Sequence, residues 1–240
     1  MKRNIIYILL YLFALTSCTS EHDAPSSKGT ATLSLEGLTR AGVTSPLAID
    51  SDLAVIIYNS VGEVYSRYSA GNIPNKIVLQ PGVFTLEVYT ENQDTWHTAN
   101  DGRGEACYYG TTEVEMEYDA VTYVNMQVPM VNYAVTLTLP YLFTELFKSY
   151  SLNLSCASRS FGIQQGEKAY FAAADGGFTY KLEATNNDNV SHSSSAINYK
   201  KVENGKLYNL KYYYGTDANS GGLDIEITDN METEDDNVEL

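Results

Sequence analysis

Phe84-Thr85-Leu86-Glu87-Val88-Tyr89 places an apolar side chain at every second position. Successive side chains of a β-strand point to opposite faces, so this segment would bury one face and wet the other. A strand with one wet face is typical of antiparallel sheets, because parallel strands are usually buried on both faces. The segment therefore predicts an antiparallel sheet that packs on a core.

The same alternation recurs along the chain, with glycine-containing turns between the segments. It is clear in residues 113–118, 123–128, 134–139 and 223–228. Asp175-Gly176 and Asn204-Gly205 are typical of type I′ hairpins, in which both central residues take positive φ. Val61-Gly62 and Pro81-Gly82 mark further tight connections. Strands and turns together predict an all-β fold.

One segment breaks the alternation. After Pro140, which is well placed to open a helix, apolar residues recur at helical spacing. These residues are Leu142, Phe143, Leu146, Phe147 and Tyr150. The pattern predicts one short helix near residues 141–150, about two turns long.

The 240 residues are enough for two small β-domains or one large one. We expect two tandem antiparallel β-sandwiches, residues 29–130 and residues 131–240. The strands expected over 122–128 and 132–139 leave too little chain for a flexible linker, so the halves are placed to share an interface. Residues 229–239 are rich in carboxylates but lack the ligand spacing of a calcium loop, which favours a solvated acidic tail.

The N-terminus has the pattern of a secretory leader. Lys2 and Arg3 precede an apolar stretch over residues 5–15 that is too short to span a bilayer. Leu15-Thr16-Ser17-Cys18 resembles a bacterial lipobox, which implies that residues 1–17 are removed and that Cys18 is the lipid attachment site. The alternative is an ordinary signal peptide with a chance cysteine.

Residues 18–28 are expected to be an acidic tether. Glu21 and Asp23 follow Cys18, and nothing in this polar stretch can build a core. An acidic stretch directly after the lipid site resembles the surface-export signal of Bacteroides-type lipoproteins. It implies an outer-membrane protein, anchored by its lipid and facing the cell exterior. The alternative is a merely soluble tether.

Charge and cysteine content exclude several classes of protein. The net charge of −15 argues against binding nucleic acid or anionic membranes. Cys107 and Cys156 lie in strand-like runs and are expected to be buried small apolar residues, with a disulfide as the alternative. Closely spaced Cys or His groups are missing, so neither a metal site nor a cofactor is predicted.

Several segments resemble a family of Bacteroides-type surface lipoproteins that is catalogued only as a domain of unknown function. They are the strand Thr30–Leu38, residues 54–65, Ile77–Glu87, Glu167–Phe171 and Lys206–Leu210. Fimbrillins and their minor, tip or anchor subunits share this plan of a lipidated precursor with two transthyretin-like or immunoglobulin-like sandwiches. The resemblance implies a protein of adhesion or fimbria assembly, with other fimbrial subunits as partners.

Leu38-Thr39-Arg40-Ala41 resembles the arginine site at which fimbrillin precursors are cut. Such a cut after Arg40 would remove the strand 30–38 and open a groove for a donor strand from another subunit. The alternative is an exposed arginine after an edge strand. The end of the chain, residues 232–240, is too acidic for a convincing donor strand, which favours an accessory or anchor subunit.

The best candidate for ligand binding is the long connection over residues 91–105. It holds the sole tryptophan, Trp96, and polar groups that could bind the hydroxyls of a sugar stacked on the indole. The candidate residues are Trp96, His97, Asp94, Asp101, Arg103, Tyr108 and Tyr109. They predict the alternative function, a surface lipoprotein that binds host or dietary glycans. The competing interpretation is that Trp96 covers the end of a sandwich core.

Catalysis has little support in the sequence. His22, His97 and His192 lie in the tether or in expected loops, away from any candidate nucleophile. Nucleophile elbows, phosphate-binding loops and His-Glu-x-x-His motifs are missing. We therefore predict a non-enzymatic protein.

Overall fold

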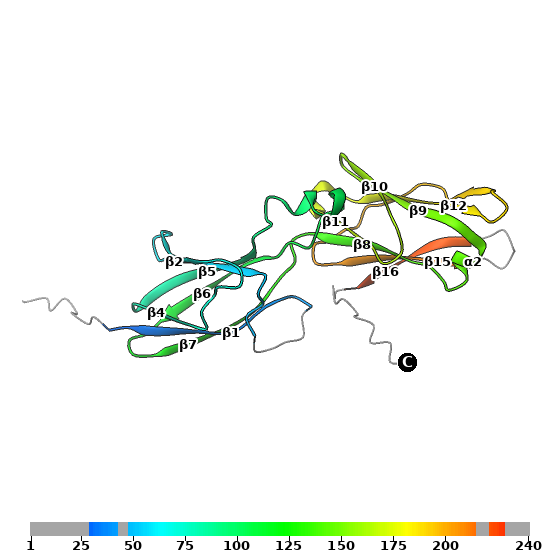
Figure 1. Ribbon diagram of the computed structural model, residues 1–240. Helices are drawn as coiled ribbons and strands as arrows, with labels where there is room; N and C mark the ends of the chain where they lie inside the picture. The colour runs from blue at the N-terminus through cyan, green and yellow to red at the C-terminus, as the bar shows by residue number, and fades with distance from the viewer. Residues whose placement is uncertain (1–28, 43–47, 215–220, 229–240) are drawn as a thin grey trace, which may run out of the picture.

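The computed structural model describes residues 29–42, 48–214 and 221–228, which form two β-sandwiches, each with its own core (Figure 1). The all-β class predicted from the alternation is confirmed. The predicted leader, Cys18, the tether and the acidic tail lie outside the described residues. Within the described part of the chain, no helix is long and apolar enough to cross a membrane.

The first sandwich packs a sheet in the order β4-β1-β7 on a sheet in the order β3-β2-β5-β6. Its strands are β1 (Ala31–Arg40), β2 (Leu53–Asn59), β3 (Val64–Tyr68), β4 (Lys76–Leu79), β5 (Gly82–Thr90), β6 (Tyr109–Met116) and β7 (Val121–Val128). The predicted alternation of β5 is confirmed, because Phe84, Leu86 and Val88 are buried in the core between the two sheets.

β1 lies at the centre of its sheet. It pairs antiparallel with β4 over Ala31–Ser34 and parallel with β7 over Thr32–Arg40. A register shift between Leu35 and Gly37 inserts one extra residue, as in a β-bulge. The shift changes the phase of the alternation, so Leu33, Leu35 and Leu38 all reach the core.

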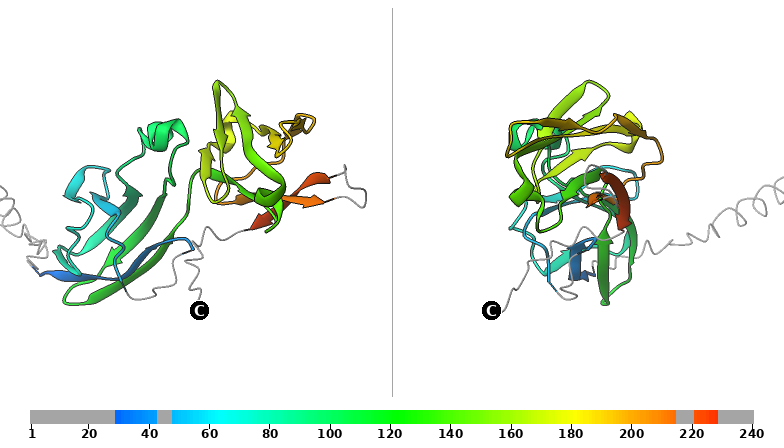
Figure 2. Two further views of the ribbon diagram at one scale, coloured as in Figure 1. Left: turned by 45° about the vertical axis from the view of Figure 1, so that its right-hand side comes forward. Right: turned by 90° about the vertical axis from the view of Figure 1, so that its right-hand side faces the viewer.

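The second sandwich packs a sheet in the order β11-β8-β15-β16 on a sheet in the order β10-β9-β12-β13, with β14 also paired to β12. Its strands are β8 (Tyr133–Thr138), β9 (Phe147–Cys156), β10 (Arg159–Ile163), β11 (Lys168–Phe171), β12 (Phe178–Asn186), β13 (Ser191–Ser193), β14 (Ile197–Tyr199), β15 (Leu207–Tyr214) and β16 (Gly221–Thr228). Figure 2 shows the two sandwiches one after the other along the molecule.

Two strand pairs depart from the antiparallel prediction. β1 runs parallel to β7, and β8 runs parallel to β15. In each sandwich a first strand therefore meets a strand that comes much later in the chain. Alternation reports only which face is buried, so it cannot distinguish the direction of a neighbouring strand.

The helix near residues 141–150 is present but shorter than predicted. α2 spans only Phe143–Leu146, and Phe147 begins β9. β9 pairs with β12 along its length, with Tyr150 opposite Ala184. The apolar residues that suggested helical spacing instead meet as aromatic contacts, with the rings of Phe143 and Phe147 stacked 4.5 Å apart. Pairing in the sheet outweighs a short helical pattern.

The two predicted type I′ hairpins are wrong. β11 and β12, on either side of Asp175-Gly176, lie in different sheets, and so do β14 and β15, on either side of Asn204-Gly205. Gly176 and Gly205 do take positive φ, but the residues before them do not, as type I′ turns would require. The glycines serve connections between sheets. Val61-Gly62, in contrast, joins the antiparallel pair β2 and β3 as a tight connection.

Candidate functional site

The predicted binding loop, residues 91–105, is compactly folded. It contains two short 3₁₀ helices, η1 (Trp96–Thr98) and η2 (Asn100–Gly102). The amide of Asn92 donates to the carboxylate of Glu105 at 2.9 Å and to the carbonyl of Ala106 at 3.0 Å, which ties the two ends of the loop together. The loop is therefore held in one shape by its own polar groups.

Trp96 is half-buried beside a residue of the second sandwich. The guanidinium carbon of Arg159, on β10, lies 5.5 Å from the centre of the indole ring. Arg159 also donates to the carbonyl of Gly102 and, at 2.6 Å, to that of Tyr170 on β11. Burial lowers the pKa of Arg159 from its ordinary value. Trp96 thus belongs to the contact between the loop and the second sandwich, although part of its ring is exposed.

The other candidate residues do not converge around Trp96. The ring of His97 lies 5.8 Å from Trp96, and Asp94 and Asp101 are exposed on the same loop. Arg103 instead forms an ion pair with Glu167, 3.4 Å away. The remaining candidates, Tyr108 and Tyr109, follow the loop in the chain.

Tyr108 points into the core of the first sandwich, and Tyr109 points to solvent. Tyr108 is 6% exposed and belongs to its core, whereas Tyr109 is 38% exposed. Tyr109 pairs with Tyr89 of β5, whose ring faces the wet side of the same sheet. Sequence reasoning missed Tyr89, although the alternation of β5 had already placed it opposite the apolar face.

Arg40, the predicted processing site, ends β1 and carries two acidic partners. Its Nε donates to Asp50 at 2.6 Å, and its Nη1 lies 3.0 Å from Asp52. Its guanidinium carbon lies 5.6 Å from the ring of Tyr108. Burial acts to lower the pKa of Arg40, but the hydrogen bond and charge of Asp50 raise it overall. The interpretation as an exposed arginine after an edge strand is wrong, because β1 is central and the side chain is only 30% exposed.

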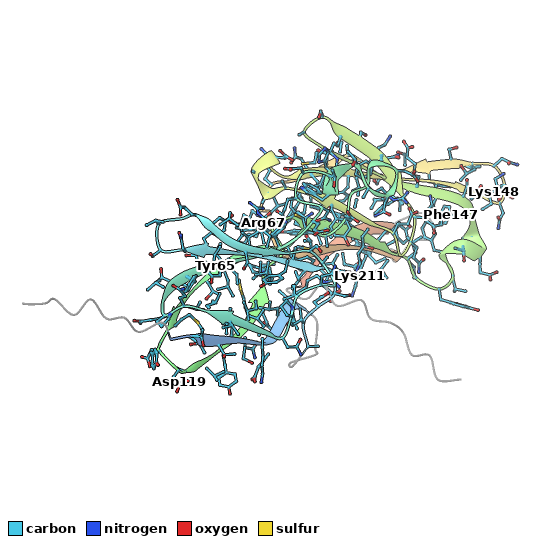
Figure 3. The ribbon with its side chains drawn as sticks, turned by 60° about the vertical axis from the view of Figure 1, so that its left-hand side comes forward. Tyr65, Arg67, Asp119, Phe147, Lys148 and Lys211 are labelled. Atoms are coloured by element: carbon cyan, nitrogen blue, oxygen red, sulfur yellow. The ribbon has the colours of Figure 1, made fainter. Side chains whose placement is uncertain are left out.

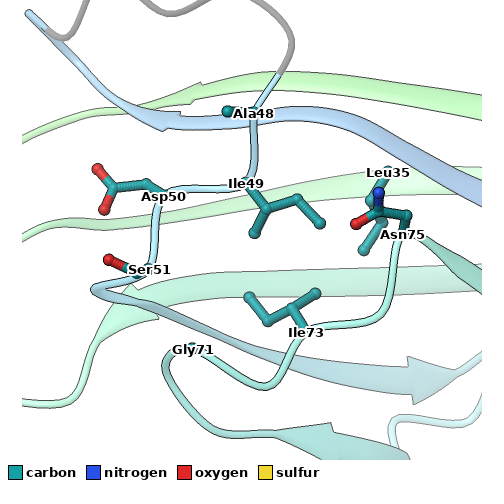
Figure 4. A pocket seen from close by; sticks show the side chains of 8 residues that line it. All are labelled: Leu35, Ala48, Ile49, Asp50, Ser51, Gly71, Ile73 and Asn75. Carbon is teal, nitrogen blue, oxygen red and sulfur yellow. The ribbon is translucent and has the colours of Figure 1, made fainter.

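A hollow of about 400 Å³ (Figure 4) includes Asp50, the hydrogen-bond partner of Arg40, in its lining. It is lined by Leu35, Ala48, Ile49, Asp50, Ser51, Gly71, Ile73 and Asn75. Its carboxylate, Asp50, already accepts a hydrogen bond from Arg40. The hollow therefore shares its carboxylate with the Arg40 site.

Cys107 and Cys156 are unpaired and buried. Cys107 lies in the first sandwich and Cys156 in the core of the second. Burial raises the pKa of both thiols. The prediction that they are buried small residues is confirmed, and the disulfide alternative is wrong.

The fold defines a tandem β-sandwich protein. The chain belongs to the family described as a domain of unknown function (DUF4493), which matches residues 12–240. The resemblance predicted from the scattered strand motifs is thereby confirmed. Among curated proteins, the sequence has no significant match.

Solved structures are similar to the chain at very low sequence identity. A candidate cell adhesion protein from Bacteroides uniformis is 10% identical, with a TM-score of 0.50 over 84% of this chain and 99% of that one. A candidate cell adhesion protein from Bacteroides eggerthii is 11% identical, with a TM-score of 0.49 over 83% and 94%. The tip fimbrial protein Mfa3 from Porphyromonas gingivalis is 10% identical, with a TM-score of 0.47 over 82% and 99%.

Proposed function

We propose that the protein is a non-enzymatic cell-surface lipoprotein that works in adhesion or fimbria assembly, as an accessory or anchor subunit. The fold shared with the candidate adhesion protein of Bacteroides uniformis supports this class of function. The protein would act by contact with other fimbrial subunits rather than by chemistry.

The leader supports anchoring at the outer membrane. Residues 1–17 would be removed, and acyl chains on Cys18 would hold the protein in the bilayer. Glu21 and Asp23 match the position of a surface-export signal, so the body would face the cell exterior. The division into sandwiches over 29–130 and 131–240 is part of the same proposal.

The position of β1 is the observation that carries the assembly role. β1 ends at Arg40 and lies between β4 and β7, with Leu33 and Leu38 fully buried. A cut after Arg40 would follow anchoring, because it removes the lipidated Cys18 together with β1. Loss of β1 would separate β4 from β7 and uncover a hydrophobic slot. A donor strand from another subunit could fill that slot with backbone hydrogen bonds and apolar side chains.

The test is mass spectrometry of the protein from intact cells before and after protease treatment. A lipidated N-terminus at Cys18, with loss of the body under protease, is expected for the surface lipoprotein. A mature form that starts at Ala41, and is missing in Arg40→Gln, is expected if the strand exchange operates. A lipidated chain that protease cannot reach would contradict the surface location.

Glycan binding in polysaccharide capture is the alternative function. The exposed part of Trp96 and the solvent-facing Tyr109 favour it, because tyrosine and tryptophan present an apolar ring with a polar handle. If the loop is the site, Trp96→Ala should abolish binding to a saccharide.

A further inference from the structure

Tyrosines gather on the outer face of the sheet β3-β2-β5-β6, away from the core. We call this surface the tyrosine face. Its residues are Tyr58, Arg67, Glu87, Tyr89, Tyr109, Glu113 and Glu115. The strand register aligns Tyr89 directly with Tyr109, and aligns Glu87 with Ile56, which in turn faces Arg67. Arg67, labelled in Figure 3, lies on the edge strand β3.

The geometry of the sheet sets the spacing on this face. Tyr89 and Tyr109 lie on neighbouring strands about 5 Å apart. Tyr58 aligns with Thr85, which lies four positions before Tyr89 on β5, so it is about 13 Å farther along the sheet. Glu87 lies between these two rows. The face is therefore long enough for several linked rings rather than one small molecule.

On the tyrosine face, small and aliphatic side chains are buried beneath partly exposed tyrosines. Ala54 and Ile56 are 0% and 5% exposed although they point outward, so the side chains around them cover them. Tyr109 is 38% exposed, and Tyr58 and Tyr89 are half-buried. The rings are thus supported from below and accessible from above.

Glu87 is held in place by Tyr58. The hydroxyl of Tyr58 donates to one carboxylate oxygen of Glu87 at 2.6 Å, and this bond raises the pKa of Tyr58. Among the described residues, the second carboxylate oxygen of Glu87 has no hydrogen-bond partner. A fixed acceptor beside supported rings suits a ligand that offers both an apolar face and hydroxyl groups.

We propose that the tyrosine face binds a neutral saccharide chain, with Tyr89 and Tyr109 as the stacking surface and Glu87 as an acceptor for sugar hydroxyls. This inference deepens the glycan-binding function proposed above and places its site on the sheet instead of the loop. Glu87, Glu113 and Glu115 outnumber Arg67 on this face. The surplus of negative charge disfavours an acidic saccharide and a second copy of this acidic chain.

The test is native gel electrophoresis of the full-length exported protein, solubilised in a nonionic detergent. The gels contain amylopectin, galactomannan, mixed-linkage β-glucan or arabinoxylan, with anionic polygalacturonate as a contrast. At least one neutral polysaccharide should retard the protein, and polygalacturonate should not. Tyr89→Ala and Tyr109→Ala should each weaken retardation about three- to tenfold, whereas Tyr109→Phe, which keeps the ring, should retain most of it.

Two control variants locate the site. Tyr123, on the outer face of the other sheet, is 63% exposed, so Tyr123→Ala should leave retardation unchanged and fold normally. Trp96→Ala distinguishes the two candidate sites, because retardation should persist in this variant if the tyrosine face is the site. Loss of binding in Trp96→Ala alone would overturn the tyrosine face but keep glycan binding. Absence of retardation by all four neutral polysaccharides would overturn both, and would leave the adhesion proposal to its own test.

Discussion

Tyr133 shows how one polar atom is accommodated inside the second core. Its side chain is fully buried, and its hydroxyl donates to the carbonyl of Gly176 at 3.2 Å. Tyr133→Phe should lower the free energy of unfolding by about 1–2 kcal/mol, because that carbonyl then keeps only the weak thiol donor of Cys156, 3.8 Å away. Urea unfolding measures the difference. Tyr123→Phe, at an exposed position, should change stability by less than about 0.5 kcal/mol, and equal effects of the two variants would contradict the argument.

Tyr170 should make the stability of the fold depend on pH. It packs against the first core although it belongs to β11, and burial raises its pKa from 10.0 to about 12. A group with a raised folded-state pKa stabilises the fold fully below its unfolded pKa and loses that contribution as the pH rises through the folded value. Stability should therefore fall between about pH 10 and pH 12. Tyr170→Phe should flatten that part of a curve of melting temperature against pH, and an unchanged slope would contradict the assignment.

The alternation of apolar and polar side chains predicted which strand residues are buried, but it did not predict which strands pair. The buried positions of β5 and β6 follow from their side-chain pattern, because each residue type reports its own solvation. The partner of β1 does not follow, since its parallel neighbour β7 comes far later in the chain. Phe147 likewise enters a strand because β12 is available to pair with it. Such long-range partners leave no local mark in the sequence.

The central place of β1 leads to a prediction for the strand. A chain that begins at Ala41 lacks the strand between β4 and β7, and so loses the buried Leu33, Leu35 and Leu38. It should melt at a lower temperature than the chain with β1, and a synthetic peptide of residues 30–40 should restore part of the loss. Thermal denaturation with and without peptide measures the effect. A peptide with Leu33→Asp and Leu38→Asp is the control and should not restore stability.

At the scale of the whole molecule, two arginines connect the sandwiches: Arg103 of the loop forms an ion pair with Glu167, and Arg159 of β10 reaches back to the loop. Arg159 contacts Trp96 and Gly102 of the first sandwich while it donates to Tyr170 of the second. The amide of Tyr170 also donates to the carbonyl of Arg103 at 2.7 Å. The sequence pointed to Trp96 because it is the sole tryptophan, but nothing local marked Arg159 as its neighbour. The candidate loop was therefore predictable, and its contact with the second sandwich was not.

Arg159→Met tests whether this contact couples the halves. The variant keeps much of the aliphatic stem but leaves the carbonyls of Gly102 and Tyr170 without their donor. The free energy of unfolding should therefore fall by about 2–4 kcal/mol. Because Trp96 is the sole tryptophan, its fluorescence reports on the junction directly. The emission should shift to longer wavelength as the ring loses its cover.

Urea unfolding of Arg159→Met should change from one transition to two, since each sandwich has its own core. Arg67→Met, at an exposed arginine, should leave the emission and the single transition unchanged. If both variants behave like the parent protein, the sandwiches are coupled by something other than Arg159.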